Sequence, residues 1–323
     1  MSNNLLFILA DPNEPQFPRL RRELADVSLV IGKSADVFAN RAEEATVLFN
    51  WSGSLGLFKQ VFAMCRNLRW VHSRSVGLER TLFPELVQSA VPLTNGVGVF
   101  SAALGEFALG AMLYFAKDFR RLIRNQQTEL WEEFDVVRLA GQTVGIVGYG
   151  DIGNAVASRA RAMGMRVLGL KRHASPDGGG DSLVERVYSP DQRREMIAQC
   201  DYVVVATPLT RETRGMMGEE EFAAMKRTAV VINIGRGPII DETALIRALT
   251  GGRIKGAALD VFDTEPLPPG HSFYKMENVL LSPHCADHTA DWLDNAMQFF
   301  IEQCRRFQKG EPLLHVVDKR LGY

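Results

Sequence analysis

Residues 143–153 read TVGIVGYGDIG, and this stretch decides the fold. Its first half is mostly apolar, which is typical of a strand that is buried on both faces. Gly148, Gly150 and Gly153 follow at the spacing of a turn that joins such a strand to a helix and holds a dinucleotide. The first glycine permits the tight turn, the second lets a pyrophosphate approach the backbone, and the third lets the helix pack closely on the sheet. The helix N-terminus would supply N–H groups for the anion.

The residues after this stretch support the same interpretation, which matters because a glycine turn alone is a weak signal. Apolar side chains recur at helical spacing from Ile152 to Met163, and Gly164 stands where a helix C-terminus needs a glycine. A second apolar run, Met165–Leu170, follows directly. The order of strand, glycine turn, helix and strand favours a dinucleotide site over a structural glycine turn in another kind of α/β protein.

Lys171 and Arg172 follow the second apolar run, at the point that should reach the ribose of a bound dinucleotide. Sites for NAD usually place Asp or Glu there, because a carboxylate accepts a hydrogen bond from the ribose 2′-hydroxyl. Two cations would leave that hydroxyl without an acceptor but would pair well with a 2′-phosphate. We therefore expect NADP as the preferred cofactor, with NAD possible, and a protein that works as a reductase. The alternative is a pair of solvated surface cations.

Composition narrows the class of protein. The chain has 323 residues, enough for two domains, with 46% hydrophobic and 23% charged residues. A net charge of −1 implies no attraction to nucleic acid or to a membrane surface. The four cysteines have no CxxC spacing, which favours a reducing, cytoplasmic compartment without a disulfide framework or a metal site. The apolar run 5–10 has no basic flank and is interpreted as a first strand rather than a signal peptide.

Two series of alternating strands and helices follow from the apolar pattern, which predicts an α/β fold with two doubly wound parallel sheets. Strands are expected at 5–10, 27–31, 46–51, 70–73 and 91–94, and then at 143–147, 165–170, 202–206, 229–233, 256–259 and 279–281. Helices are expected at 18–25, 57–65, 101–124 and 291–309. We expect a flavodoxin-like outer domain, 1–102 plus 290–323, and a Rossmann cofactor domain, 103–289, with the active site in the cleft between them.

Arg236, Glu265 and His284 are the candidate catalytic residues. Each lies in a loop after an apolar strand, and ligands bind at that carboxyl edge in open α/β sheets. A guanidinium can clamp a carboxylate and polarise the neighbouring carbonyl, a histidine can deliver a proton, and a carboxylate can orient the imidazole. Taken singly, each residue has a structural alternative. Arg236 could form an ion pair at a strand end, Glu265 could be an acidic turn residue, and His284 could be a loop histidine whose hydrogen bonds are all made within the protein.

Five runs of the sequence resemble the D-isomer-specific 2-hydroxyacid dehydrogenase family, over nearly the whole chain. They are residues 145–153, 207–213, 233–245, 257–266 and 282–289. The resemblance implies that Arg236 binds the substrate, that Glu265 pairs with the catalytic histidine, and that His284 is the general acid/base. It also implies homodimers in which the cofactor domains are in contact.

The same resemblance extends the binding sites. It implies that Asp260 approaches the nicotinamide carboxamide, that Thr207 and Pro208 lie on the adenine side, and that backbone N–H groups near Val76 and Gly77 hold the substrate carboxylate. The expected cofactor-binding residues are Gly148, Tyr149, Gly150, Asp151, Ile152, Gly153, Lys171, Arg172, Thr207, Pro208, Thr213, Ile234 and Asp260. The expected substrate-binding residues are Trp51, Arg74, Ser75, Val76, Gly77 and Arg236.

The chain departs from the family pattern in two places. Residues 73–79 read SRSVGLE where many relatives have a GAGVD-like run. This departure leaves the size and charge of the substrate open, since Arg74 could reach a second anionic group. Lys171 and Arg172 resemble the glyoxylate/hydroxypyruvate reductase branch that prefers NADPH. We expect reduction of a small 2-oxo acid to a D-2-hydroxy acid. The alternative is a corepressor-like protein that binds the dinucleotide without turnover, for which a long disordered tail is typical.

Overall fold

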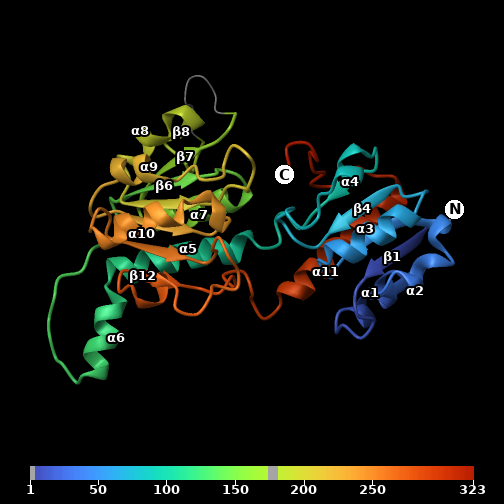
Figure 1. Ribbon diagram of the computed structural model, residues 1–323, viewed down its shortest axis with the longest axis horizontal. Coiled ribbons are helices and arrows are strands. Elements are labelled where there is room, and N and C mark those ends of the chain that lie inside the picture. Colours follow the sequence, from blue (N-terminus) through green and yellow to red (C-terminus); the bar gives the residue numbers. More distant parts are fainter. Residues whose placement is uncertain (1–3, 174–180) are drawn as a thin grey trace. The chain divides into compact units, whose positions relative to one another are not determined.

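The computed structural model describes residues 4–173 and 181–323. The glycine run 178–180, which its composition predicts as a surface loop, lies outside these ranges. The chain divides into two compact units, Met1–Val99 with Ala290–Tyr323, and Phe100–Thr289. We expected the first division after residue 102, and it falls after Val99 because helix α5 (Ser101–Ala116) belongs entirely to the second unit. Each unit holds one parallel sheet with helices against it (Figure 1).

The first unit has a five-stranded parallel sheet in the order β2-β1-β3-β4-β5, the order of flavodoxin-like folds. Its strands are β1 (Leu5–Leu9), β2 (Ser28–Gly32), β3 (Ala45–Asn50), β4 (Trp70–Ser73) and β5 (Leu93–Thr94). Its helices are α1 (Phe17–Glu23), α2 (Asp36–Ala39), α3 (Leu55–Met64), α4 (Pro84–Gln88) and α11 (Trp292–Lys309). The last helix returns to this unit because the Phe300 ring stacks on Phe49 at 3.8 Å and on Trp70 at 5.5 Å.

The second unit has a seven-stranded parallel sheet in the order β12-β11-β10-β9-β6-β7-β8. Its strands are β6 (Thr143–Val147), β7 (Arg166–Leu170), β8 (Arg186–Tyr188), β9 (Tyr202–Val205), β10 (Val230–Asn233), β11 (Gly256–Leu259) and β12 (Val279–Leu281). The six strands from β8 to β11 have the order of a dinucleotide-binding sheet, and β12 extends it. The expected count of six strands was wrong, because β8 is three residues long and too short to show a pattern.

The helices of this unit are α5, α6 (Phe119–Gln127), α7 (Asp151–Ala162), α8 (Arg193–Ile197), α9 (Glu219–Ala224) and α10 (Glu242–Thr250). All of them except α6 lie against the sheet (Figure 1). Short 3-10 turns lie at Ala42–Glu44, Pro190–Gln192, Gly237–Ile239 and Ser272–Lys275. Helices α5 and α7 pack closely, since a Cβ on Gly105 would lie 3.0 Å from the Ala155 carbonyl oxygen.

The single helix expected at 101–124 is wrong. It breaks after Ala116, because Asp118 takes the left-handed conformation at φ 49° and its carboxylate accepts a hydrogen bond from the Arg121 N–H. An Asp side chain that caps the next helix in this way competes with helix continuation. As a result α6 projects from the rest of its unit, and residues 129–138 return from it as an extended segment (Figure 1).

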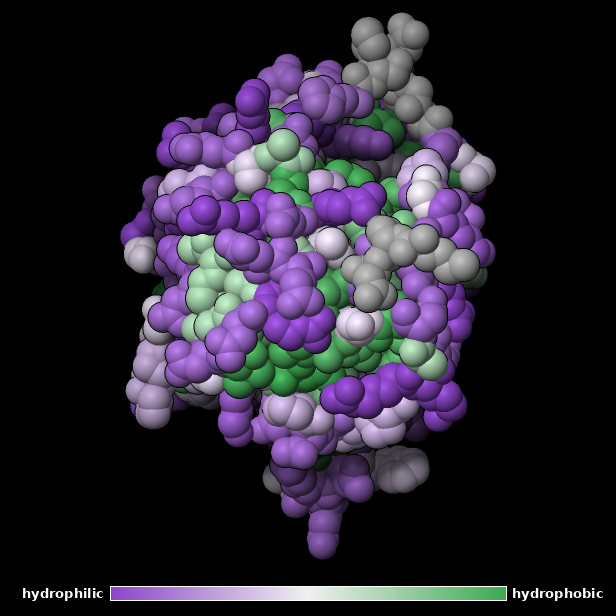
Figure 2. Space-filling model, turned by 90° about the vertical axis from the view of Figure 1, so that its right-hand side faces the viewer, coloured by the Kyte–Doolittle hydropathy of each residue, from purple (hydrophilic) through white to green (hydrophobic). Residues whose placement is uncertain are grey.

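The surface is mixed in character. On the face shown in Figure 2, hydrophilic side chains predominate and hydrophobic ones gather near the middle. Within the described ranges no helix is both long and apolar enough to cross a membrane.

All four cysteines are unpaired, and only Cys285 is exposed.

Candidate active site

The glycine turn forms a cradle at the carboxyl end of β6. Gly148 has φ 102°, and a Cβ there would lie 2.6 Å from the Thr207 backbone nitrogen. A Cβ on Gly153 would lie 2.6 Å from the Gly148 carbonyl oxygen, so α7 starts directly against the turn. Gly150 is different, because a Cβ there would meet nothing within 4 Å. Open space therefore lies over the middle glycine, where a pyrophosphate needs to approach the backbone.

The N-terminus of α7 completes this cradle. No side chain caps it, so its first N–H groups and the positive end of its dipole remain for an anion. One oxygen of the Asp151 carboxylate accepts a hydrogen bond from the Ser101 hydroxyl of α5. The Tyr149 hydroxyl donates to Asp181 at 2.7 Å, and burial with this partner raises the pKa of Tyr149 to about 12. The residues present thus fit the pyrophosphate of a dinucleotide.

Lys171 and Arg172 lie directly after β7, the strand that neighbours β6 in the sheet. Lys171 is exposed, and its N–H donates to the Tyr188 carbonyl at 3.0 Å. The Arg172 guanidinium lies 3.4 Å from the Glu212 carboxylate, which sequence reasoning did not single out. A hydrogen bond from Thr210, at 2.7 Å, is the main cause of the lowered pKa of Glu212. Arg172 therefore sits beside the loop that runs from Thr207 to Thr213.

That loop is stabilised from within. The Thr213 hydroxyl donates to the Pro208 carbonyl at 2.7 Å and accepts from the Thr210 N–H at 2.7 Å. Thr213 thus shapes the loop through its side chain. Ile234 is buried after β10, and its N–H donates to Val205 at 3.1 Å, so its side chain belongs to the core.

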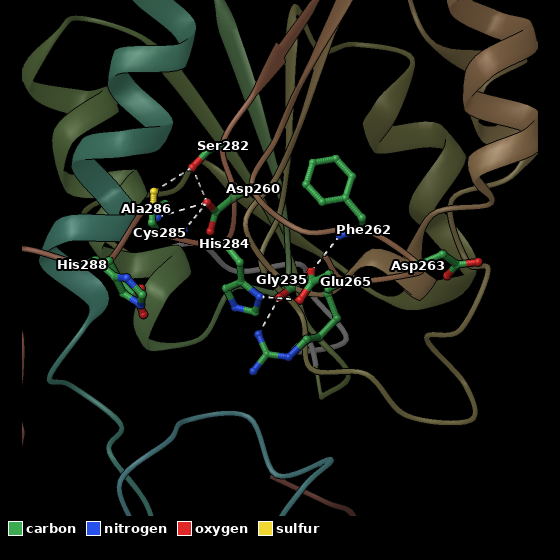
Figure 3. A network of polar contacts seen from close by, with 12 residues as sticks. Gly235, Asp260, Phe262, Asp263, Glu265, Ser282, His284, Cys285, Ala286 and His288 are labelled. Carbon is green, nitrogen blue, oxygen red and sulfur yellow. Dashed lines mark hydrogen bonds and ion pairs between the residues drawn. The ribbon is translucent and has the colours of Figure 1, made fainter. Parts of the chain in front are cut away.

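His284 and Glu265 form a close pair (Figure 3). The His284 Nδ1 lies 2.7 Å from one Glu265 carboxylate oxygen, and the other oxygen accepts from the Phe262 N–H at 2.9 Å. Both side chains are partly exposed, at 42% and 29%. A carboxylate on Nδ1 orients the ring and leaves Nε2 to exchange a proton with a ligand.

Asp260 clamps the loop that carries His284 (Figure 3). It is buried, and its Oδ1 accepts from the Ser282 hydroxyl at 2.5 Å and from the N–H groups of Cys285 and Ala286, both at 3.0 Å. Its carbonyl accepts from the His284 N–H at 2.9 Å. His284 itself has φ 52°, a conformation that costs a residue with a side chain free energy and persists only where neighbours enforce it. Sequence reasoning missed Ser282, and only its position at a strand end could have indicated it.

Replacing Asp260 by Ala should release this loop. Three donors then lose their acceptor, and each buried unsatisfied donor costs about 1–3 kcal/mol. We expect a fall in kcat of at least ~10-fold together with a lower free energy of unfolding, measured by steady-state kinetics and urea denaturation. Asp260→Asn keeps one acceptor oxygen and should recover part of both losses. An Ala variant with wild-type kcat would contradict the clamp.

Arg236 lies on the loop after β10, against the loop of Glu265. A Cβ on the neighbouring Gly237 would lie 1.9 Å from the Phe262 carbonyl carbon, so only glycine allows the two loops to meet. The Asn233 amide donates to the Arg236 carbonyl at 3.1 Å, and the Arg236 Nη1 donates to the Gly235 carbonyl at 2.6 Å. The loop of Glu265 thus contacts the loop of Arg236 on one side and pairs with His284 on the other, at one edge of the sheet.

The expected substrate residues of the first unit follow β3 and β4. Trp51 is 1% exposed and packs among Phe17 and Phe49. Arg74 lies over the Trp51 ring at 4.8 Å and over the Trp292 ring at 5.1 Å. Ser75 is exposed, the Val76 carbonyl accepts from the Asn95 amide at 2.9 Å, and Gly77 is partly exposed. In the part of the chain that the structure describes, no group of three His, Cys, Asp or Glu residues could hold a metal ion.

A dinucleotide-binding sheet with an imidazole–carboxylate pair at its carboxyl edge is typical of NAD(P)-dependent oxidoreductases, and we assign the chain to that class. Residues 109–286 match the family model described as D-isomer specific 2-hydroxyacid dehydrogenase, NAD binding domain. The chain belongs to the D-isomer specific 2-hydroxyacid dehydrogenase family.

Individual relatives agree with this assignment. The chain is 34% identical over 268 residues to a glyoxylate reductase of Korarchaeum cryptofilum, covering 81% of this chain and 80% of that one. It is 28% identical to a D-3-phosphoglycerate dehydrogenase of Methanocaldococcus jannaschii over 96% of its own length, but spans only 59% of that protein.

Solved structures show the same fold. A family member from Xanthobacter autotrophicus Py2 in complex with NADPH and MES has a TM-score of 0.85 and 32% identity over the whole of both chains. An NADPH-dependent glyoxylate/hydroxypyruvate reductase from Sinorhizobium meliloti, in complex with NADP and sulfate, has a TM-score of 0.83 and 26% identity, over 99% of this chain and 100% of that one. The expected fold class is confirmed. The names of the relatives support the reduction of 2-oxo acids as the kind of reaction.

Proposed function

We propose that the protein is an NADPH-preferring reductase that converts small 2-oxo acids, such as glyoxylate and hydroxypyruvate, to 2-hydroxy acids, with the D configuration where the product is chiral. The observation that carries the proposal is the 2.7 Å pair of His284 and Glu265, in loop contact with Arg236 at the edge of a sheet with a dinucleotide cradle. The glyoxylate reductases among the relatives, and the NADPH-bound structure of similar fold, support it.

The chain's own residues have distinct parts in this reaction. A bound reduced nicotinamide supplies the hydride to the keto carbon. Protonated His284 donates from Nε2 to the keto oxygen, and Glu265 holds the ring and stabilises its cationic form. Arg236 binds the substrate carboxylate through the fork of its guanidinium. The backbone N–H groups of Val76 and Gly77 are proposed as further donors to that carboxylate.

The preference for NADPH follows from the charges after β7. Lys171 and Arg172 occupy the point where an acidic residue would select NAD, and neither offers an acceptor to a ribose hydroxyl. A 2′-phosphate would gain two cationic partners and would compete with Glu212 for Arg172. NAD stays possible as a cofactor of lower affinity, because NAD and NADP share the pyrophosphate that the glycine cradle would bind.

Changing both Lys171 and Arg172 to Ala should weaken NADPH far more than NADH. Each hydrogen bond to a charged group is worth about 1.5–3 kcal/mol, so the KM for NADPH should rise by roughly 100-fold or more, while that for NADH changes little. Arg166→Ala, which removes an exposed cation at the other end of the same strand, is the matched control and should leave the ratio unchanged. Equal losses for both cofactors would refute the phosphate assignment.

We also propose that the enzyme is a homodimer through its cofactor unit. Helix α6 and the segment after it expose several large apolar side chains, among them Ile123 at 52% and Trp131 at 94%. The others in this segment are Phe119, Leu122, Leu130, Val136 and Val137. Contiguous exposed apolar residues of this kind mark protein interfaces.

Ile123→Glu should therefore convert the dimer to a monomer, since burying a carboxylate in an apolar interface is costly. Light scattering after size-exclusion chromatography measures the mass directly. Val37→Glu is the matched control, because Val37 is 49% exposed but belongs to the first unit. If the wild type is already monomeric, or if only the Val37 variant dissociates, the proposed interface is wrong.

The proposed activity is tested with a panel of 2-oxo acids and both cofactors. We expect NADPH oxidation with glyoxylate and hydroxypyruvate, with a higher kcat/KM than with NADH.

The unpaired cysteines are in keeping with the cytoplasm, where we place the enzyme. The corepressor-like alternative is not favoured, because several of the proteins similar to this chain are named as reductases.

A further inference from the structure

Glu242, the first residue of α10, reaches from its helix to a neighbouring loop. Its Oε1 accepts a hydrogen bond from the Asp263 backbone N–H at 2.7 Å, and its Oε2 lies 3.7 Å from the His271 Nε2. The Glu242 side chain is only 19% exposed, so these two partners replace much of its contact with water. An acid that only favours a helix N-terminus needs no partner outside the helix. Glu242 therefore joins α10 to both ends of the segment 263–271.

The segment 263–271 carries Glu265 and has few contacts of its own. Every residue from 263 to 270 is exposed except Leu267, which is partly buried. The Leu267 carbonyl accepts a hydrogen bond from the Tyr274 hydroxyl at 3.1 Å. A catalytic side chain must be held within about 0.5 Å of its working position. Because most of the segment is in water, its two ends decide how firmly Glu265 is held.

The start of the segment is fixed by two carboxylates. The Phe262 N–H donates to Glu265, and the next N–H along the chain, that of Asp263, donates to Glu242. The Asp263 side chain points away from Glu265, so only its backbone takes part (Figure 3). Hydrogen bonds to charged acceptors are stronger than neutral ones. Glu242 thus restrains the backbone two positions before Glu265.

The end of the segment is fixed through His271. Its Nδ1 accepts from the Phe273 N–H at 3.4 Å, and its ring lies 4.8 Å from the Phe273 ring. Phe273 is 1% exposed, so this contact joins His271 to the core. A neutral histidine whose Nδ1 accepts a hydrogen bond carries its proton on Nε2, the atom that faces Glu242. At 3.7 Å this contact is weaker than the hydrogen bond from Asp263.

We infer that Glu242 is a positioning residue for the catalytic pair. It ties the two ends of the segment 263–271 together and, through Glu265, fixes the ring of His284. Its Oε1 holds the backbone two residues before Glu265, and Glu265 in turn binds the His284 Nδ1 at 2.7 Å. All of these residues belong to the second unit. The inference rests on the proposed function where it predicts kinetics, because that function makes His284 the proton donor.

Glu242→Ala should lower kcat for glyoxylate reduction by roughly 10- to 100-fold, because a small misplacement of a reacting group has an effect of that size. The KM for glyoxylate and the Kd for NADPH should change little, since Arg236 and the glycine cradle are untouched. Glu242→Gln keeps an acceptor for the Asp263 N–H and should recover most of the loss. His271→Leu removes only the weaker contact and should lower kcat less than Glu242→Ala does. Steady-state kinetics and fluorescence titration measure these values.

Glu219→Ala is the matched control. Glu219 is also the first residue of a helix, α9, and it also forms an ion pair, with Arg247 at 2.6 Å. Its variant therefore loses the same favourable interaction with a helix N-terminus, without a change in the segment 263–271. It should leave kcat unchanged. An equal fall of kcat in Glu219→Ala and Glu242→Ala overturns the inference.

A double-mutant cycle separates positioning from a general loss of structure. In Glu265→Gln the ring of His284 has already lost its charged partner, so adding Glu242→Ala should lower kcat by less than about twofold more. A merely structural role of Glu242 would lower kcat by the same factor in both backgrounds. That result, or a wild-type kcat in Glu242→Ala, overturns the inference.

Hydrogen exchange tests the same assignment without any substrate. The NADPH-bound enzyme is placed in deuterated water, and the peptide that covers 262–273 is followed by mass spectrometry. Its exchange should be roughly 10-fold or more faster in Glu242→Ala, the range for losing a hydrogen bond to a charged acceptor, and unchanged in Glu219→Ala. The peptide that covers 143–153 should exchange equally in all of these proteins. His271→Leu should also speed exchange at 262–273, by a smaller factor, and keeps the test open if Glu242→Ala does not fold.

The exchange result stands apart from the proposed reduction. Faster exchange at 262–273 in Glu242→Ala supports the tie even in an enzyme that reduces no 2-oxo acid. Unchanged exchange there, in both Glu242→Ala and His271→Leu, overturns the inference whether or not glyoxylate is reduced.

Discussion

His284→Gln is expected to lower kcat for glyoxylate reduction by roughly 100- to 10,000-fold, the range for removing a general acid. The reason is geometric, because Glu265 holds the ring at Nδ1 and leaves Nε2 as the proton donor. Glutamine is similar in length and can keep a hydrogen bond to Glu265, but it cannot release a proton at neutral pH. NADPH binding, measured by fluorescence titration, should be retained, since the cradle at Gly148 and Gly150 is untouched.

A second histidine provides the control for this experiment. His288 lies four positions after His284 and is exposed on the same segment. His288→Gln should keep kcat within about twofold of the wild type, because exposed substitutions away from a site have small effects. Should His284→Gln turn over at the wild-type rate, the acid would have to be another group, and the mechanism proposed for this pair would be wrong.

Arg236→Lys is expected to lower kcat/KM for glyoxylate by roughly 10- to 150-fold, because a hydrogen bond to a charged group is worth about 1.5–3 kcal/mol. Lysine keeps the charge but not the planar fork, so the test isolates two-point binding of a carboxylate. The loss should appear in KM as well as in kcat, because the same contact binds the substrate and places its carbonyl. Steady-state kinetics with glyoxylate as the varied substrate measure both.

Arg247→Lys is the matched control for that change. Arg247 forms an exposed ion pair with Glu219 at 2.6 Å on the same unit, and exposed pairs of this kind contribute little. It should leave kcat/KM unaltered. An Arg236→Lys enzyme with wild-type kcat/KM would remove the carboxylate clamp from the account and leave Arg236 as a residue of the loop only.

The fold was largely predictable because it depends on local patterns. The glycine turn, the apolar runs before and after it and the C-terminal Gly164, at φ 75°, are each visible within a few residues of sequence. Strand β8 was missed because three residues give no periodicity. The break at Asp118 was missed because the apolar pattern continues across it, while one capping side chain decides the conformation.

The residue types of the candidate site could be predicted from the sequence, but the hydrogen bonds that hold its loops in place could not. Strand ends at one edge of a parallel sheet indicated Arg236, Glu265 and His284, since that edge follows from topology. The clamp by Asp260 depends on side-chain hydrogen bonds between loops 22 or more positions apart, which no local pattern reports. The contacts of the Arg74 guanidinium with the Trp51 and Trp292 rings also join residues distant in sequence. The departure of the Arg74 loop from the family pattern was the single signal.

Rapid mixing of the NADPH-bound enzyme with hydroxypyruvate measures hydride transfer itself, because the absorbance of the cofactor is followed through one turnover. We expect the reduced cofactor to be consumed in stoichiometric amount and the product to be the D-isomer of the hydroxy acid. His284→Gln should abolish the fast phase while still binding NADPH. If the wild-type enzyme binds NADPH but leaves it reduced with both hydroxypyruvate and glyoxylate, the proposed reductase activity is wrong.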